Sequence, residues 1–338
     1  MTTIGADAGG AQAPRLAASR HHITDLQRRF PLLQVVALAV LYFAGAATVP
    51  GWTTRNTLSS MLVMAALLGL AGAGQTVVVL GGGIDFSVGS FITAGGVFIT
   101  ELTSVDNWSA WAAIVLALAV AVIGGTLNGV ISYRFRIEPL VVTLGVGSLL
   151  TGVLTGWTSG AVTGTPPNWT DSAVSVTTST FGIPVPPIVA IWAVLAVLAG
   201  IVLARTRAGR SLYLNGTNPV AAKRALVRTG WTWTAGFIVS AVLATFVGIL
   251  LAGDGGGNLD AGDPYLFQAL TAVIVGGTMF GGRGDYWRTV LGALILTVVS
   301  YLLEAHNYST GVQEMVYGVL IMIVVAAYGR ERRIRDRV

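Results

Sequence analysis

The ionisable side chain of Asp85 lies in a break between two apolar runs, where it could take part in chemistry. The apolar run VVVL stops at three consecutive glycines, Gly81–Gly83, and the sequence IDFS, which contains Asp85, precedes the next apolar run at Val88. Glycine admits backbone angles that other residues resist. A carboxylate on a helix at the bilayer centre costs about 2.5–3.5 kcal/mol. We therefore expect the break at a membrane face or in a protein-lined cavity. The alternative is a solvated Asp85 in a tight turn between two membrane helices.

Other chemistry is missing from the sequence. There is no cysteine, and no Asp, Glu, Lys, Arg or His lies in the middle third of any apolar run. Proton-driven carriers usually rely on such intramembrane groups, and membrane enzymes need clustered carboxylates or His/Asp/Glu metal ligands. A glycine-rich phosphate loop ending in Gly-Lys-Ser/Thr is also absent. The sequence thus predicts a conduit that has no cofactor, couples no protons and binds no ATP; sodium coupling through neutral oxygens stays open.

Composition predicts an all-α polytopic membrane protein. The 338 residues are 54% hydrophobic and only 10% charged, whereas soluble domains carry about 25% charged residues. Ten apolar runs near the length of about 20 residues that crosses a bilayer can be drawn: 32–49, 58–80, 87–103, 110–133, 139–158, 187–204, 231–252, 265–280, 287–303 and 311–328.

Basic residues assign the sides of these spans. If the N-terminus is cytoplasmic and the spans alternate, every Lys and Arg except Arg55 falls at the cytoplasmic side, as the positive-inside rule requires. The prediction is a cytoplasmic tail over 1–31, a membrane domain over 32–328, and a basic cytoplasmic tail over 329–338. Because this topology explains the net charge of +5, the basic balance does not indicate nucleic-acid binding.

The two longest connections offer surfaces for partners. The external segment 159–186 is rich in Ser, Thr, Pro and Gly, and its prolines prevent a long helix; it is either a docking surface or an ordinary loop. In the cytoplasmic segment 205–230, Asn218 and Pro219 predict a short helix through Val227, closed by Gly230.

That short helix has two interpretations. Its small and apolar residues recur at helical spacing, at Ala221, Ala222, Ala225 and Leu226. This strip would either dock into a groove of another protein or rest on anionic lipid headgroups. A second glycine break, GGTMFGGRG over 276–284, resembles the first. Paired breaks point to a transport pathway, with tight helix packing as the alternative.

Four motifs in order carry a family resemblance that runs from about residue 35 to 330. The sequence GGIDFSVGS at 82–90 resembles the GGIDLSVGS signature of ABC-transporter permeases for ribose and other simple sugars, with Phe86 in place of Leu. Segment 206–228 is similar to the cytoplasmic coupling loop of that family, although Leu226 stands where Gly is usual. The glycines of 276–284 resemble a third signature, and GIPVP at 182–186 an external stretch.

The resemblance implies partners and roles. It implies a second permease subunit, ATPase subunits inside, and a periplasmic or extracellular sugar-binding protein, all at the cell membrane. Matching positions imply ATPase coupling at Gly209, Arg210, Asn218, Ala221, Ala222 and, on the same helix, Arg224. The pathway is expected around the second span and the first break. Hydroxyl and amide groups suit a neutral sugar, and the candidates are Gln75, Thr76, Asp85, Ser87, Asn128 and Thr143; for each, the alternative is an interhelical hydrogen bond.

Other functions compete with sugar import. Permeases for branched-chain amino acids belong to the same wider group. A stand-alone secondary carrier lacks the expected intramembrane charges and leaves the basic loop 205–230 unexplained. A membrane enzyme lacks the residue clusters it would need, and an assembly scaffold is a further alternative.

Overall fold

The computed structural model describes residues 31–282 and 284–335, with side chains up to residue 326. Most of the predicted tail 1–31, Arg283 and the end of the tail 329–338 lie outside the described residues. Within them the regular elements are helices, apart from an isolated bridge between Thr180 and Ile183, which confirms the all-helical fold. The helices are α2 (Leu32–Thr48), α3 (Arg55–Gly81), α4 (Val88–Ser104), α5 (Ala110–Phe135), α6 (Pro139–Trp157), α7 (Asn168–Val174), α8 (Pro187–Arg205), α9 (Arg207–Thr217), α10 (Pro219–Arg224), α11 (Thr229–Leu251), α12 (Asp263–Gly276), α13 (Tyr286–Ala305) and α14 (Thr310–Arg335).

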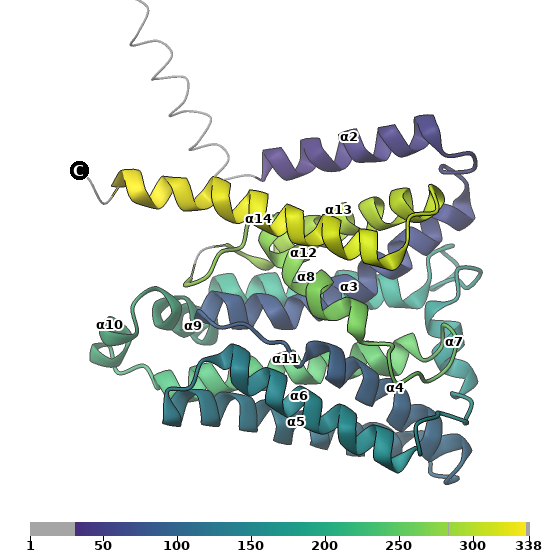
Figure 1. Ribbon diagram of the computed structural model, residues 1–338, viewed down its shortest axis with the longest axis horizontal. Coiled ribbons are helices and arrows are strands. Elements are labelled where there is room, and N and C mark those ends of the chain that lie inside the picture. The colour runs from purple at the N-terminus through teal and green to yellow at the C-terminus, as the bar shows by residue number, and fades with distance from the viewer. Residues whose placement is uncertain (1–30, 283, 336–338) are drawn as a thin grey trace, which may run out of the picture.

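The long helices lie side by side as a bundle (Figure 1). Among the described residues, six helices are long and apolar enough to cross a membrane: α3, α5, α6, α8, α11 and α13. The shorter apolar helices are α2 and the part of α14 over Thr310–Ala326. Helices α4 and α12 are also short, with 17 and 14 residues. Each of the ten predicted runs thus coincides with a helix, with end points that differ by a few residues.

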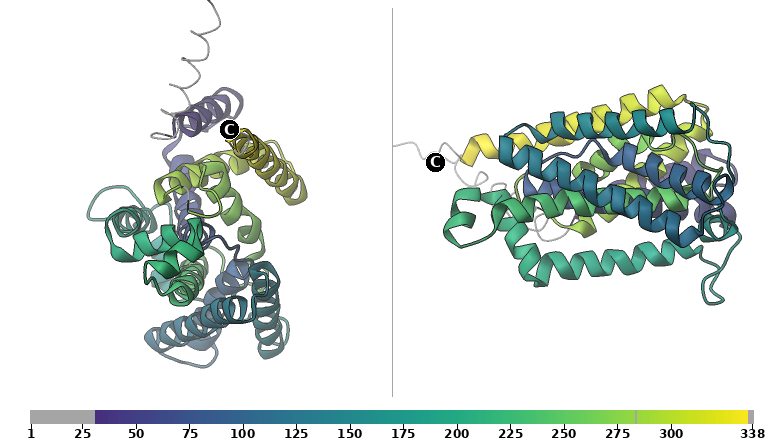
Figure 2. Two further views of the ribbon diagram at one scale, coloured as in Figure 1. Left: turned by 90° about the vertical axis from the view of Figure 1, so that its left-hand side faces the viewer. Right: turned by 90° about the horizontal axis from the view of Figure 1, so that it is seen from below.

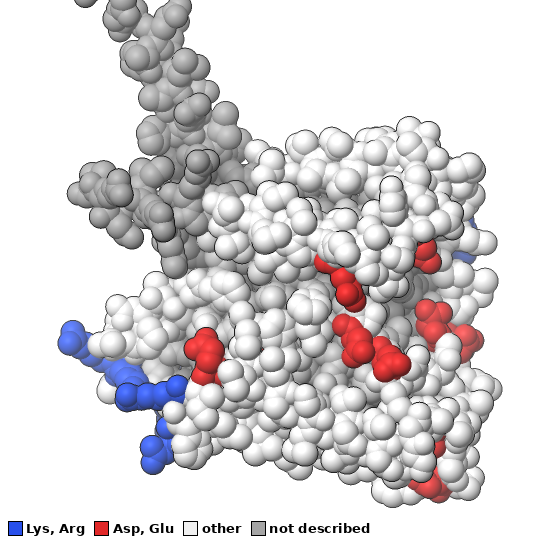
Figure 3. All heavy atoms as spheres, viewed as in Figure 1, with Lys and Arg blue, Asp and Glu red and all other residues white. Residues whose placement is uncertain are grey.

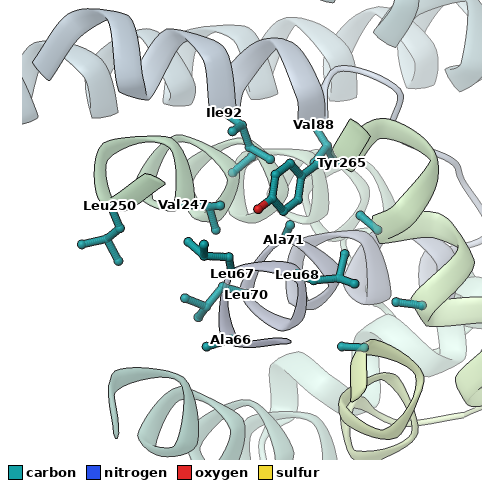
Figure 4. Packing of buried hydrophobic residues seen from close by; sticks show 14 of the residues in the cluster. Ala66, Leu67, Leu68, Leu70, Ala71, Val88, Ile92, Val247, Leu250 and Tyr265 are labelled. Carbon is teal, nitrogen blue, oxygen red and sulfur yellow. The ribbon is translucent and has the colours of Figure 1, made fainter. Parts of the chain in front are cut away.

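Helix α3 is the centre of the bundle. It packs against α11, α12, α13 and α8, and its middle turns are buried on all sides, as expected for a helix that is apolar around its whole circumference. In Figure 4, Leu67 and Leu70 of α3 lie near Val247 and Leu250 of α11, and Tyr265 of α12 lies close by. This core fixes the end of α3, where the first glycine break begins.

Several details of the predicted connections are wrong. The helix after Asn218 ends at Arg224 and not at Val227, because Leu226 adopts a left-handed conformation (φ 59°). Gly230 does not close it, since Gly230 already belongs to α11. The segment 159–186 forms no long helix, as predicted, but it contains the two-turn helix α7.

Helices α4 and α11 approach each other at small residues. A β-carbon at Gly248 would lie 1.8 Å from the carbonyl oxygen of Ile92, and one at Gly95 would lie 2.1 Å from that of Thr245. These glycines allow backbone contact that any side chain would prevent.

We therefore predict that Gly248→Ala lowers the thermal midpoint of the detergent-solubilised protein by several degrees, because overpacking costs about 1–3 kcal/mol. Gly152→Ala in α6 is the matched control, since a β-carbon there meets nothing within 4 Å. Equal midpoints for the two variants, measured by thermal unfolding, would contradict the packing argument.

Candidate functional site

The first glycine break ends α3 with a left-handed residue. Gly82 has φ 98°, a region that favours glycine, and the Gly83 amide donates to the Val78 carbonyl at 3.0 Å. This hydrogen bond closes the last turn of α3. The chain then turns back into the bundle before α4 begins at Val88 (Figure 1).

The residues after the break form a polar cluster with α5 and α6. The Asp85 Oδ1 accepts hydrogen bonds from the Ser87 amide (2.9 Å) and the Ser87 hydroxyl (2.5 Å). Asn128 of α5 donates through Nδ2 to the Ser87 Oγ at 2.8 Å. The Phe86 amide donates to the Thr143 Oγ1 of α6 at 3.0 Å. Four of the predicted pathway residues are thus brought together, and they hold segment 85–87 against two helices.

Thr76 does not join this cluster. Its hydroxyl donates to the Gly72 carbonyl at 2.6 Å and shares a hydrogen bond of 2.7 Å with the Thr289 hydroxyl of α13. For Thr76 the structure therefore gives the interhelical hydrogen bond that was the alternative interpretation.

Several buried polar atoms have no hydrogen-bond partner among the described residues. Five of them are the Asp85 Oδ2, the Asn128 Oδ1, the Ser240 Oγ and both polar atoms of the Gln75 amide, and these four residues are at most 1% exposed. Trp52, Thr100 and Thr245 carry the other three. Leaving a polar group buried and unpaired costs about 1–3 kcal/mol, so native structures contain few of them. Atoms of this kind are candidates to receive a polar ligand.

Ser240 was missed by sequence reasoning. It lies on α11, where a β-carbon at Gly74 of α3 would come within 2.6 Å of the Ser240 Cα. The sequence feature that could have identified Ser240 is its position as the single hydroxyl residue in the apolar run FIVSAVL.

Segment 205–230, predicted to be the cytoplasmic coupling loop, contains the helices α9 and α10, whose residues differ in exposure. The Asn218 Oδ1 accepts hydrogen bonds from the amides of Val220 (3.1 Å) and Ala221 (3.0 Å), which confirms the predicted cap of α10. Ala222, however, is fully buried, while Leu226 is 91% exposed. The predicted apolar strip is therefore divided: Ala222 supports the loop from inside and is not free for a partner.

The other predicted coupling residues are also either buried or exposed. Gly209 is buried, and a β-carbon there would lie 2.2 Å from the Leu203 carbonyl oxygen. Arg210 and Arg224 are exposed.

Helix α9 contacts both glycine breaks. A β-carbon at Gly216 would lie 1.9 Å from the Leu80 carbonyl oxygen, and the Tyr213 hydroxyl donates to the Gly284 carbonyl at 2.8 Å. Burial, helped by Asp285, raises the pKa of Tyr213 to about 12, so this hydroxyl keeps its proton near neutral pH. The two breaks also meet directly, because the Gly281 amide donates to the Val79 carbonyl at 3.2 Å.

Segment 159–186, predicted to be external, is held by hydrogen bonds near its start and exposed at the turn near its end. The Glu101 Oε1 of α4 accepts hydrogen bonds from the amides of Thr163 (2.5 Å) and Gly164 (3.1 Å). Phe181, at the tip of the turn formed by Thr180 and Ile183, is completely exposed. Ile183 of the same turn is 61% exposed, so the turn leaves apolar surface uncovered.

A family model matches most of the chain. The model described as "Branched-chain amino acid transport system / permease component" matches residues 57–325, which include both glycine breaks, the polar cluster and the coupling loop.

Curated relatives cover nearly the same range. The chain is 30% identical over 297 residues to the ribose import permease protein of Escherichia coli (strain K12), covering 86% of this chain and 91% of the relative. It is 31% identical over 296 residues to a probable ABC transporter permease protein of the same strain, with 87% of each covered. It is 28% identical over 319 residues to the fructose import permease protein of Rhizobium meliloti, covering 91% of this chain and 86% of the relative. No solved structure matches the chain at a significant level.

The Thr143 hydroxyl has a testable role in the polar cluster. Thr143→Val removes the acceptor of the Phe86 amide, and one lost hydrogen bond of about 1.4 kcal/mol corresponds to roughly tenfold faster exchange of that amide. Hydrogen exchange of a peptide covering 84–88 measures this rate. Thr143→Ser keeps the oxygen and should exchange like the unmodified protein; equal rates in all three would show that the hydrogen bond does not hold the segment.

Proposed function

The chain belongs to the family of permease components of branched-chain amino acid transport systems, and from this premise we propose that it is the membrane-spanning subunit of an ATP-driven sugar importer. The resemblance noted in the sequence is confirmed at the level of the family. The observation that carries the sugar assignment is the similarity to the ribose and fructose import permeases over more than four fifths of the chain. A permease subunit is not itself an enzyme.

The proposed topology has ten spans with both ends in the cytoplasm. The six long apolar helices and the shorter helices α2, α4, α12 and α14 would alternate across the membrane. In Figure 3, Lys and Arg gather at the end of the molecule near α9 and α10, and most Asp and Glu lie toward the other end. The positive-inside rule supports placing the α9–α10 end in the cytoplasm.

The coupling loop is proposed to receive the ATPase subunits. Exposed Arg210, Arg224 and the partly exposed Ala221 offer the contact, while buried Gly209 and Ala222 and the capping residue Asn218 hold the loop in shape. A movement of α10 reaches α9 directly, and α9 contacts the glycine breaks through Tyr213 and Gly216.

The pathway is proposed to open at the polar cluster. The unpaired atoms of Gln75, Asp85, Asn128 and Ser240 offer donors and acceptors of the kind that recognise sugar hydroxyl groups. Two permease subunits would form the pathway between them, and an external sugar-binding protein would contact segment 159–186 at Phe181, whose side chain is free.

A branched-chain amino acid is the second candidate, because the family model carries that description. Such a substrate has an ammonium and a carboxylate group. Among its described members the cluster offers the Asp85 carboxylate for an ammonium group but no Lys or Arg for a carboxylate. It therefore suits a sugar, which has no charged groups, better.

Transport by the reconstituted protein tests the proposal. Liposomes that contain the chain with its ATPase subunits and binding protein are expected to accumulate radiolabelled ribose or fructose only in the presence of ATP. A partner ATPase with its phosphate-loop lysine replaced is the control. Accumulation by the chain alone under a proton or sodium gradient would establish a secondary carrier instead, and uptake of leucine without sugar would favour the second candidate.

The hydrogen bond from Tyr213 to Gly284 makes a prediction about coupling. Tyr213→Phe removes only the hydroxyl and should lower the sugar imported per ATP hydrolysed, by roughly tenfold for about 1.4 kcal/mol of lost contact, without abolishing ATP hydrolysis. Tyr308→Phe alters an exposed tyrosine outside the coupling loop and should leave the ratio unchanged. The same ratio in both variants would exclude a coupling role for Tyr213.

A further inference from the structure

A large apolar groove separates α8 from α11. Its volume is about 1060 Å³, and it is walled by Leu198 and Val202 of α8 and by Val239 and Leu243 of α11, with Val77 of α3 beneath. Leu198, Val202 and Val239 are each between 41 and 50% exposed. In Figure 2, α8 (teal) stands at the edge of the bundle. In the proposed topology this groove faces the lipid.

One end of the groove is basic. Arg207, Arg210 and Arg228 line it there, and no Asp or Glu does. Arg210 donates to the Arg205 carbonyl at 3.2 Å, but within the described part of the chain none of the three forms an ion pair. Unneutralised guanidinium groups at the cytoplasmic end of an apolar groove are complementary to a lipid phosphate.

The length of the groove fits one leaflet. From Arg228 to Leu243 helix α11 rises about 22 Å at 1.5 Å per residue. Half of the hydrocarbon core is about 15 Å, which leaves several ångströms for a headgroup beside the arginines.

Two exposed apolar side chains, Trp231 and Leu226, lie at the basic end of the groove. Trp231 is 67% exposed, and tryptophan favours the headgroup level of membranes. Leu226 is 91% exposed in a left-handed backbone conformation (φ 59°) that disfavours a branched side chain. Both line the groove, so a lipid there would cover apolar surface that is otherwise in water.

We propose that the groove between α8 and α11 binds one anionic phospholipid of the cytoplasmic leaflet, with its acyl chains between the two helices and its phosphate beside Arg207 and Arg228. The inference rests on the membrane topology proposed above. Because α9 forms part of the groove wall and also contacts both glycine breaks, the bound lipid would brace α9 in the position seen here.

Native mass spectrometry of the detergent-solubilised transporter, supplied with phosphatidylglycerol or phosphatidylcholine, tests the proposal. We expect one retained phosphatidylglycerol per chain in preference to phosphatidylcholine. The double variant Arg207→Gln, Arg228→Gln should weaken that preference about 25-fold, because each basic residue contributes roughly fivefold. The control double variant Arg134→Gln, Arg136→Gln removes two exposed arginines outside the groove and should leave the preference unchanged.

Leu226→Gly is a second variant that suits the left-handed backbone and should lower retention severalfold without disturbing the loop. Equal retention of the two lipids, or equal losses in the two arginine pairs, would overturn the proposal. If the groove variants changed the number of subunits in the transporter and left lipid retention unchanged, the groove would be a protein interface, and the lipid proposal would be overturned as well. ATP-driven uptake, measured after the same preparations are reconstituted into liposomes, separates the two conclusions: lipid retention without uptake would refute only the transport function, and uptake without retention only the lipid site.

Discussion

The hydrogen bond between the Gly281 amide and the Val79 carbonyl joins the two places where helices of this bundle are broken. Broken helix ends expose N–H and C=O groups, each of which costs several kcal/mol if lipid surrounds it. The two breaks meet this requirement together, and the Gly216 backbone of α9 covers the adjoining Leu80 carbonyl. Glycine is required at these contacts because a β-carbon at Gly216 would collide with the backbone opposite. The three glycine-containing segments therefore meet where α3, α9 and α12 end.

The same contact places the coupling loop close to the polar cluster. Only the short segment 82–87 separates the end of α3, which α9 touches, from Ser87, which α5 holds through Asn128. Thr143 of α6 holds the same segment from another side. The segment after α3 is thus a short covalent link between the helix end that α9 contacts and the polar cluster around Asp85.

The sequence was sufficient for features that depend on local chemistry. Run length and hydropathy predicted the helices, and Asn218 followed by Pro219 predicted the start of α10, because a capping side chain bonds amides two and three residues away. It could not predict contacts between distant segments: the pairing of the two breaks, the burial of Ala222 and the partnership of Thr76 with Thr289 depend on how helices pack. Leu226 shows the difference well. Its identity was visible as a departure from the family pattern, but its left-handed conformation and exposure were not.

The unpaired polar atoms affect the stability of the helix arrangement seen here. Each buried group without a hydrogen bond disfavours the arrangement seen here by about 1–3 kcal/mol; Asp85 and Asn128 of the cluster carry such atoms, and so do Gln75 and Ser240. The close glycine contacts of α4 with α11 and of α9 with α3 act in the opposite direction, because they stabilise the arrangement seen here by backbone packing. Because the two contributions oppose each other, a ligand that pairs the buried polar atoms needs only a modest preference for a different helix arrangement to shift the population toward it.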